Sequence, residues 1–240
     1  FEFSTNTINW STMTEKAGVG SNGTSSLVFS ASGTSFTFGW DIAADLPNQE
    51  SATARVRLRS TDTLANSSLT VSSAFAIDTR GPVILNISTS QTPGGSSVTV
   101  QYDLSDNSGS GNTVRLLISD DSGATFTVAT STLSGDIGAG VSAGASRSVT
   151  WNAGTDFAGQ ENSSMQVKIQ GTDVFNNAGS FVTSTVFTVD AKSPVVSSVS
   201  ASQASNSNIV TVNYTLADLT AAGNLVEFNV SSDNGSTWTV

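Results

Sequence analysis

The stretch IDTRGPVILNISTSQ (residues 77–91) returns 112 positions later as VDAKSPVVSSVSASQ (residues 189–203). The match continues without a gap from 77–128 onto 189–240, where 21 of 52 positions are identical. Self-similarity at a fixed step is the signature of tandem copies of one structural unit. It also weakens the case for a unique active site, because a polar residue that recurs once per copy more often belongs to the scaffold.

A weaker copy lies at the start of the chain. The segment WDIAADLPNQE (40–50) matches WNAGTDFAGQE (151–161), and VRLRSTDTLAN (56–66) matches VKIQGTDVFNN (167–177). We therefore expect three domains, of which only the second is complete. They are 1–81, without its opening strands; 82–193, complete; and 194–240, the opening strands of a third.

The incomplete ends leave two interpretations open. In the first, the tail of one chain completes the head of the next by strand donation between subunits. In the second, residues 1–240 are a window on a longer array of the same units. The short linkers Asp78–Pro82 and Asp190–Pro194 restrict the orientation of neighbouring copies in either case, because proline fixes φ and interrupts a sheet. The expected shape is an elongated rod.

The complete copy has the pattern of β-strands throughout. Val98, Val100, Tyr102 and Leu104 alternate with polar residues, which is the period of a half-buried strand. Turn residues punctuate the copy and no helical period is present, so the sequence predicts an all-β antiparallel sandwich. The glycine-rich GAGVSAG (138–144) is expected to be a mobile loop.

The alternation of apolar and polar residues predicts seven strands in the complete copy and a set of core residues. The strands are Val83–Ser88, Val98–Leu104, Val114–Ser119, Thr125–Thr130, Arg147–Trp151, Met165–Gln170 and Phe181–Val189. The core residues are Trp40, Trp151, Tyr102, Tyr214, Val167, Ile169 and Phe187.

The composition and net charge exclude several classes of binding partner. Net charge is −10, so the surface repels nucleic acid and anionic membranes, and no long apolar run is present that could insert into a membrane. Ser and Thr make up 73 residues and only 12% of residues are charged, which together with a low lysine content favours an extracellular protein. Cysteine is absent, so disulfides and thiolate metal sites are excluded.

The sequence also argues against catalysis. Histidine and cysteine are both absent, so the usual Ser–His and Cys–His pairs cannot form. Candidate carboxylates for glycoside hydrolysis include Asp156 and Glu161, but these recur as Asp45 and Glu50 in the first copy, which favours a scaffold role. We therefore expect no enzyme activity.

Two segments resemble a known class of domains. The stretches GTDVFNNAG (171–179) and STDTLANSS (60–68) are similar to a signature near the last strands of bacterial Ig-like and fibronectin-III-like surface domains. The resemblance implies tandem Ig-like β-sandwiches, with a repeat of about 112 residues, in an extracellular bacterial or archaeal protein.

A third motif resembles the Asp boxes of sialidase-type propellers. SSDNGSTW (231–238) fits the pattern S-x-D-x-G-x-T-W, and SDDSGATF (119–126) fits all but its last position. We interpret both as hairpin staples, in which Asp121 or Asp233 accepts backbone N–H bonds and Gly123 or Gly235 takes a positive φ. A glycan contact is the alternative.

Calcium is the one cofactor that the sequence suggests. In an Ig-like sandwich the loops 105–112 and 173–180 lie at the same end, beside the linker that contains Asp78. Aspartate, asparagine and carbonyl oxygens suit Ca²⁺, whereas an Asx-capped turn in water is the alternative. The candidate ligands are Asp78, Asp106 and Asp173 at the first junction, and Asp190 and Asp218 at the second.

These observations favour a non-catalytic structural protein that self-associates as the repeat subunit of a surface filament, sheath, S-layer or stalk. The alternative is an adhesin, or an accessory carbohydrate-binding module of a larger secreted protein, with glycans or a host surface as partner. That alternative predicts an exposed aromatic platform, for which Trp10 and Trp238 are the candidates.

Overall fold

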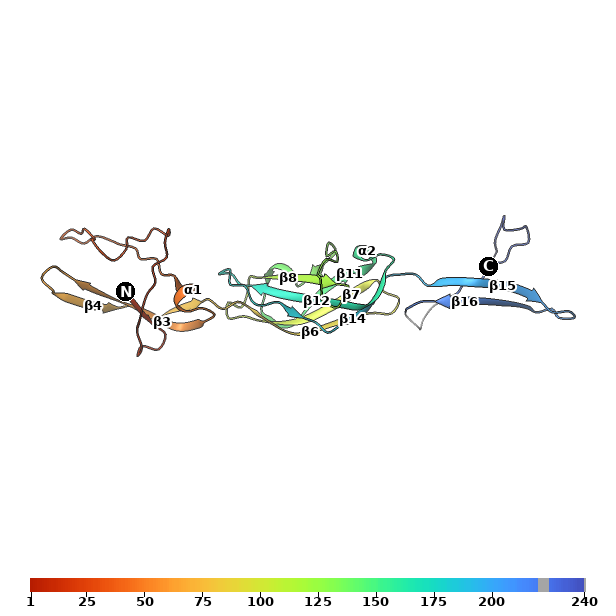
Figure 1. The fold of residues 1–240 in the computed structure, drawn as a ribbon, viewed down its shortest axis with the longest axis horizontal. Coiled ribbons are helices and arrows are strands. Elements are labelled where there is room, and N and C mark those ends of the chain that lie inside the picture. Colours follow the sequence, from red (N-terminus) through yellow and green to blue (C-terminus); the bar gives the residue numbers. More distant parts are fainter. Residues whose placement is uncertain (220–224, 240) are drawn as a thin grey trace.

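The computed structural model describes residues 1–219 and 225–239, and its strands all pair in antiparallel fashion. The three copies follow one another along the long axis of the molecule (Figure 1). Parts of the expected third domain, 220–224 and 240, lie outside the described residues. The protein is therefore an all-β chain with several separate sheets.

The middle copy contains two sheets that share one core. The first has the strand order β6-β7-β11-β9, and the second has the order β10-β8-β12-β13 with β14 pairing further along β12. The strands of the first sheet are β6 (Val83–Gln91), β7 (Ser97–Ser105), β9 (Ser134–Gly135) and β11 (Gly144–Asn152). Those of the second are β8 (Asn112–Ser119), β10 (Gly138–Val141), β12 (Glu161–Thr172), β13 (Val182–Thr183) and β14 (Phe187–Asp190).

The core forms because the alternate residues of these strands face one another. Val98, Val100 and Tyr102 of β7 are buried, as are Val167 and Ile169 of β12. Such period-two burial is what the pleat of a strand imposes. The four expected core residues of this copy that lie on β7, β11 and β12 are fully buried, and Phe187 packs against them while half-buried. The four are Tyr102, Trp151, Val167 and Ile169.

The first copy has a single connected set of strands. The order is β2-β1-β3-β4, and β5 pairs with β3. Its elements are β1 (Glu2–Ser4), β2 (Ser11–Thr12), α1 (Ile42–Asp45), β3 (Glu50–Thr61), β4 (Ser67–Val71) and β5 (Phe75–Asp78). The middle copy has a matching one-turn helix, α2 (Ala153–Asp156). The described strands of the last copy are β15 (Val195–Gln203) and β16 (Val210–Ala217), which pair with each other.

The strand pairing reproduces the sequence repeat. Glu50 of β3 lies opposite Asp78 of β5, and Glu161 of β12 lies opposite Asp190 of β14. Each pair of strands then shifts register at the same place, between Ser51 and Ala54 in one case and between Asn162 and Met165 in the other. Equivalent sequences thus form equivalent ladders at the ends of the first and middle copies.

Two of the expected strands differ in the structure. Thr125–Thr130 forms no strand, and only Val128 makes an isolated bridge, to Ile118. The reason is that the Asp121 carboxylate accepts the backbone N–H of Thr125, so this backbone group bonds to a side chain instead of a neighbouring strand. Phe181–Val189 is divided into β13 and β14 by Ser184, whose hydroxyl accepts the backbone N–H of Val167 in place of a carbonyl.

The expectation of a mobile loop at 138–144 is also wrong. Residues Gly138–Val141 form β10, which pairs with β8 at the edge of its sheet. Gly138 and Gly140 both have positive φ, at 79° and 85°, and the pairing shifts register between Gly138 and Val141. Glycine allows this irregular edge strand because it has no Cβ to oppose the left-handed conformation.

Two expected core residues are not fully buried. Trp40 is half-buried and Tyr214 is 41% exposed, whereas their counterparts Trp151 and Tyr102 are fully buried. The described first copy has counterparts of β12 and β14 but none of β6 and β7, whereas the described last copy has only the counterparts of β6 and β7, so neither residue lies between two sheets. No helix among the described residues has the length and apolar character needed to cross a membrane.

Candidate metal centre at the junction of the first and middle copies

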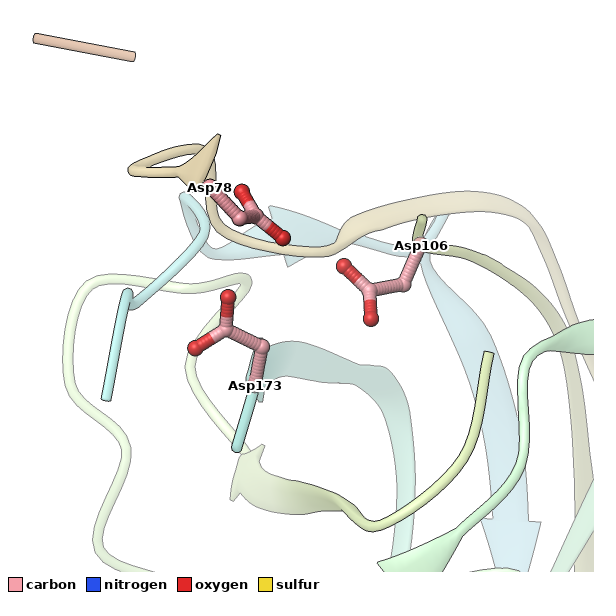
Figure 2. Close-up of side chains that lie close together, drawn as sticks. All are labelled: Asp78, Asp106 and Asp173. Atoms are coloured by element: carbon pink, nitrogen blue, oxygen red, sulfur yellow. The ribbon is translucent and has the colours of Figure 1, made fainter. Parts of the chain in front are cut away.

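Three aspartates from separate parts of the chain meet where the first copy joins the middle one. Asp78 ends β5, Asp106 follows β7 and Asp173 follows β12. Figure 2 shows their carboxylates turned toward a common centre. One oxygen of each lies within 4.8 Å of the others. The structure thus brings together the three residues that the sequence suggested for this junction.

The linker between the copies is tightly packed against the loop that contains Asp173. A Cβ at Gly81 would lie 2.4 Å from the carbonyl carbon of Ala178, and one at Gly179 would lie 1.9 Å from the carbonyl oxygen of Pro82. The Asn177 amide also donates a 3.3 Å hydrogen bond to the carbonyl of Asp78. Backbone lies against backbone here, so the linker has little room to move.

Each aspartate uses an oxygen to fix its own turn. Asp173 Oδ1 accepts the backbone N–H groups of Phe175 (2.9 Å) and Asn177 (2.7 Å), and its Oδ2 accepts the Asn177 amide (2.8 Å). Asp106 Oδ2 accepts the backbone N–H and the hydroxyl of Ser108. These bonds position the carboxylates, and they agree with the Asx-turn interpretation of the motif.

The charges in the cluster are not compensated by basic side chains. Among the described residues, no ion pair involves Asp78, Asp106 or Asp173. Glu50 lies opposite Asp78 in the ladder and pairs instead with Arg80, at 3.7 Å. Like charges directly opposite each other destabilise a sheet. The cluster is therefore a concentration of negative charge.

The electrostatics of Asp78 reflect this crowding. Burial raises the pKa of its carboxyl above the ordinary value, although the hydrogen bond from the backbone N–H of Arg80 opposes the shift. The charges of Asp173, Asp106 and Glu50 add to the rise in this pKa. Ionisation of the Asp78 carboxyl is therefore less favourable at this position than in water.

A buried asparagine lies beside the cluster. Asn112 is 0% exposed, and within the described structure neither its amide oxygen nor its nitrogen has a hydrogen-bond partner. Thr113 pairs with Thr172, so the next positions along the two strands are Asn112 and Asp173, both on the inward face. Asp78 Oδ2 is likewise buried without a partner. Each such group costs about 1–3 kcal/mol when left unsatisfied.

A second cluster lies at the next junction. Oxygens of Glu161, Asp190 and Asp218 fall within 4.8 Å of one another. Asp190 and Asp218 stand 112 positions after Asp78 and Asp106, as the repeat predicts. The recurrence of Glu161 as Glu50 predicts a scaffold role, and the sequence gives no sign that Glu161 lies in this cluster. Lys192 pairs with Glu161 at 3.1 Å, in the way that Arg80 pairs with Glu50.

In both Asp-box motifs the aspartate holds the turn, as expected. Asp121 accepts the backbone N–H and the hydroxyl of Thr125, and Asp233 binds Thr237 in the same way. Gly123 and Gly235 have φ values of 86° and 85°, as expected.

The aromatic residues that end these two motifs, Phe126 and Trp238, and the other platform candidate, Trp10, have different surroundings. Lys168 Nζ lies 4.0 Å from the ring centre of Phe126, and Arg57 lies 4.4 Å from that of Trp10. These cation–π contacts give two of the three aromatics a packing role. Trp238, by contrast, is 63% exposed.

The carboxylate of Asp156 also has a structural setting. It accepts the Trp151 indole N–H at 3.0 Å, together with the backbone N–H and hydroxyl of Thr132. Asp45 in the first copy accepts the Trp40 indole N–H at 2.6 Å. The scaffold interpretation of this recurring aspartate therefore agrees with its hydrogen bonds.

Comparisons with protein-family models, with curated proteins and with solved structures gave no match to this chain.

Proposed function

We propose that the chain is a non-catalytic extracellular structural protein of a bacterium or archaeon, built from tandem Ig-like modules as the repeat subunit of a surface filament, sheath, S-layer or stalk. The observation that carries this proposal is the packed junction, in which Gly81 and Pro82 lie against Ala178 and Gly179. A linker held in this way transmits orientation from one module to the next. Successive modules then form a rod, which is the element from which such assemblies are made.

The Ig-like assignment is part of the proposal. It is supported by the two antiparallel sheets of the middle copy, which enclose one core, and by the repeat of the β12–β14 ladder as β3–β5. The absence of catalysis is supported by the lack of histidine and cysteine in the sequence. The bonds that Asp156 makes to Trp151 and Thr132 also commit that carboxylate to the fold.

Two experiments test the structural role. Electron microscopy of the purified chain at neutral pH should show ordered filaments or sheets, and monomers across a wide concentration range would contradict self-assembly. Antibodies against the chain should label intact source cells without permeabilisation. Labelling that requires permeabilised cells would contradict the surface location.

The adhesin or carbohydrate-binding alternative rests on Trp238, which lies exposed on its hairpin. A glycan array tests it directly. Binding that is lost in Trp238→Ala but retained in Trp10→Ala would favour this second function, because Trp10 lies under Arg57 as part of the packing. An array on which the chain binds no glycan would contradict the carbohydrate-binding alternative.

A further inference from the structure

We propose that Asp78, Asp106 and Asp173 bind one Ca²⁺ ion, with the buried amide oxygen of Asn112 as a further ligand, and that this ion ties the first copy to the middle one. The inference goes beyond the proposed function, since an ion at this junction does not require that the chain form a filament.

The geometry of the three carboxylates fits calcium. Their oxygens lie within 4.8 Å of one another, and ligand oxygens on opposite sides of a Ca²⁺ ion are about 5 Å apart, twice a bond of about 2.3–2.6 Å. Ca²⁺ accepts several protein carboxylates in flexible geometry, whereas Mg²⁺ demands a near-ideal octahedron and retains most of its water. A site with several anionic oxygens therefore favours Ca²⁺.

Asn112 supplies an observation independent of the acidic cluster. Its side chain is completely buried and has no hydrogen-bond partner in the described structure, and it occupies the position next to Asp173 on the inward face. A buried amide is rarely left without a partner. An amide oxygen is also a hard ligand of the kind that Ca²⁺ uses.

The repeat preserves three of the four proposed ligands. Asp78 and Asp106 return as Asp190 and Asp218, and Asn112 returns in the sequence as Asn224. The neighbouring linker residues differ, since Gly81 is replaced by Ser193.

The consequence of the ion follows from the origin of its ligands. Asp78 belongs to the last strand of the first copy, whereas Asp106 and Asp173 belong to the middle copy. An ion bound to all three therefore bridges the copies. Without it, three negative charges repel one another across the same junction.

The test uses the whole chain, freed of metal with chelator and then titrated with calcium chloride alone in a calorimeter. An Asp218→Asn background disables the second cluster, so that only the first junction is measured. We expect one bound Ca²⁺, which Asp106→Asn and Asp173→Asn weaken by about tenfold or more because affinity follows the ligand charge. Magnesium at the same concentration should bind much more weakly.

The matched control is Asp62→Asn. Asp62 forms the same turn in the first copy, accepting the N–H groups of Leu64 and Asn66 and the Asn66 amide, but it lies outside the cluster. Its substitution should leave calcium binding unchanged. Calcium affinity that is the same in Asp106→Asn, Asp173→Asn and the parent, or no binding at millimolar calcium, would overturn the proposal.

Thermal unfolding separates a ligand from a merely structural aspartate. Asparagine at position 106 keeps an acceptor oxygen for Ser108 but removes one of three like charges. Asp106→Asn should therefore raise the midpoint of unfolding in chelator and lower it, relative to the parent, in calcium. A decrease of the midpoint in both conditions would assign Asp106 to the turn alone, and would overturn the site. Failure of the filament experiment would leave these readouts unaffected.

Discussion

The substitution Gly179→Ala tests whether the junction is as tightly packed as its geometry indicates. The new Cβ would lie 1.9 Å from the carbonyl oxygen of Pro82, whereas ordinary van der Waals contact begins at 3.4 Å. The linker must then move by about 1.5 Å, the difference between these distances. The two residues in contact are both held in place. The ring of Pro82 fixes its φ, and the backbone N–H of Gly179 donates a hydrogen bond to the carbonyl of Gly171.

The expected cost is about 1–3 kcal/mol, the usual penalty for forcing an extra methyl group into packed surroundings. For a unit of about 100 residues, this corresponds to a fall of roughly 5 °C or more in the midpoint of thermal unfolding. The sign of the change in stability is informative. Alanine at an unstrained glycine position stabilises a protein by about 0.4–1 kcal/mol, because it lowers the conformational entropy of the unfolded chain. Loose packing and tight packing therefore predict opposite shifts.

The assay is scanning calorimetry in chelator, with small-angle X-ray scattering to follow the length of the particle. The control is Ser68→Ala, at the position in the first copy that corresponds to Gly179. Gly81→Ala approaches the same contact from the other side, so the two substitutions together should cost less than their sum. An unchanged or raised midpoint in Gly179→Ala would refute the reasoning, and with it the rigid linker.

Three further changes probe the middle copy. Tyr102→Phe should destabilise it by about 1–2 kcal/mol in urea denaturation, because the buried hydroxyl donates a 2.5 Å bond to the carbonyl of Asp136; an equal stability would mean that water replaces the bond. Ile169→Ala, at a fully buried position, should cost about 2–5 kcal/mol in the same assay, and a loss below 1 kcal/mol would contradict a close-packed core. The hydrogen bonds from Thr125 lower the pKa of Asp121 from 3.8 to about 2, so its stabilising effect is complete above pH 3.8 and is lost as the pH falls toward 2. Asp121→Asn should therefore reduce the acid sensitivity of unfolding in this range, and an identical pH profile would exclude that role.

The sequence was most informative where side chains alternate along a strand. Val98, Val100 and Tyr102 predict β7 because burial of one face requires the period of two that the pleat imposes. Prediction failed where a side chain replaces a backbone partner. At Thr125 the carboxylate of Asp121 accepts the N–H, and at Val167 the hydroxyl of Ser184 does so. These side-chain hydrogen bonds leave the alternation of apolar and polar residues unchanged. The alternation therefore cannot indicate that a strand ends or divides at these positions.

The acidic cluster shows a different limit of sequence reasoning. Recurrence in each copy predicts a scaffold residue, and for Asp156 the bonds to Trp151 and Thr132 agree with that prediction. Glu161 recurs as well, yet it lies among carboxylates at a junction. A site shared by two copies of a tandem array must draw its ligands from both, so its residues recur once per copy as a scaffold residue does. Hydrogen-bond donors alone do not separate the two cases, because the Asp173 carboxylate accepts donors just as the Asp156 carboxylate does. What distinguishes them is that an oxygen of Asp173 also lies within 4.8 Å of oxygens of two other carboxylates, which come from separate parts of the chain.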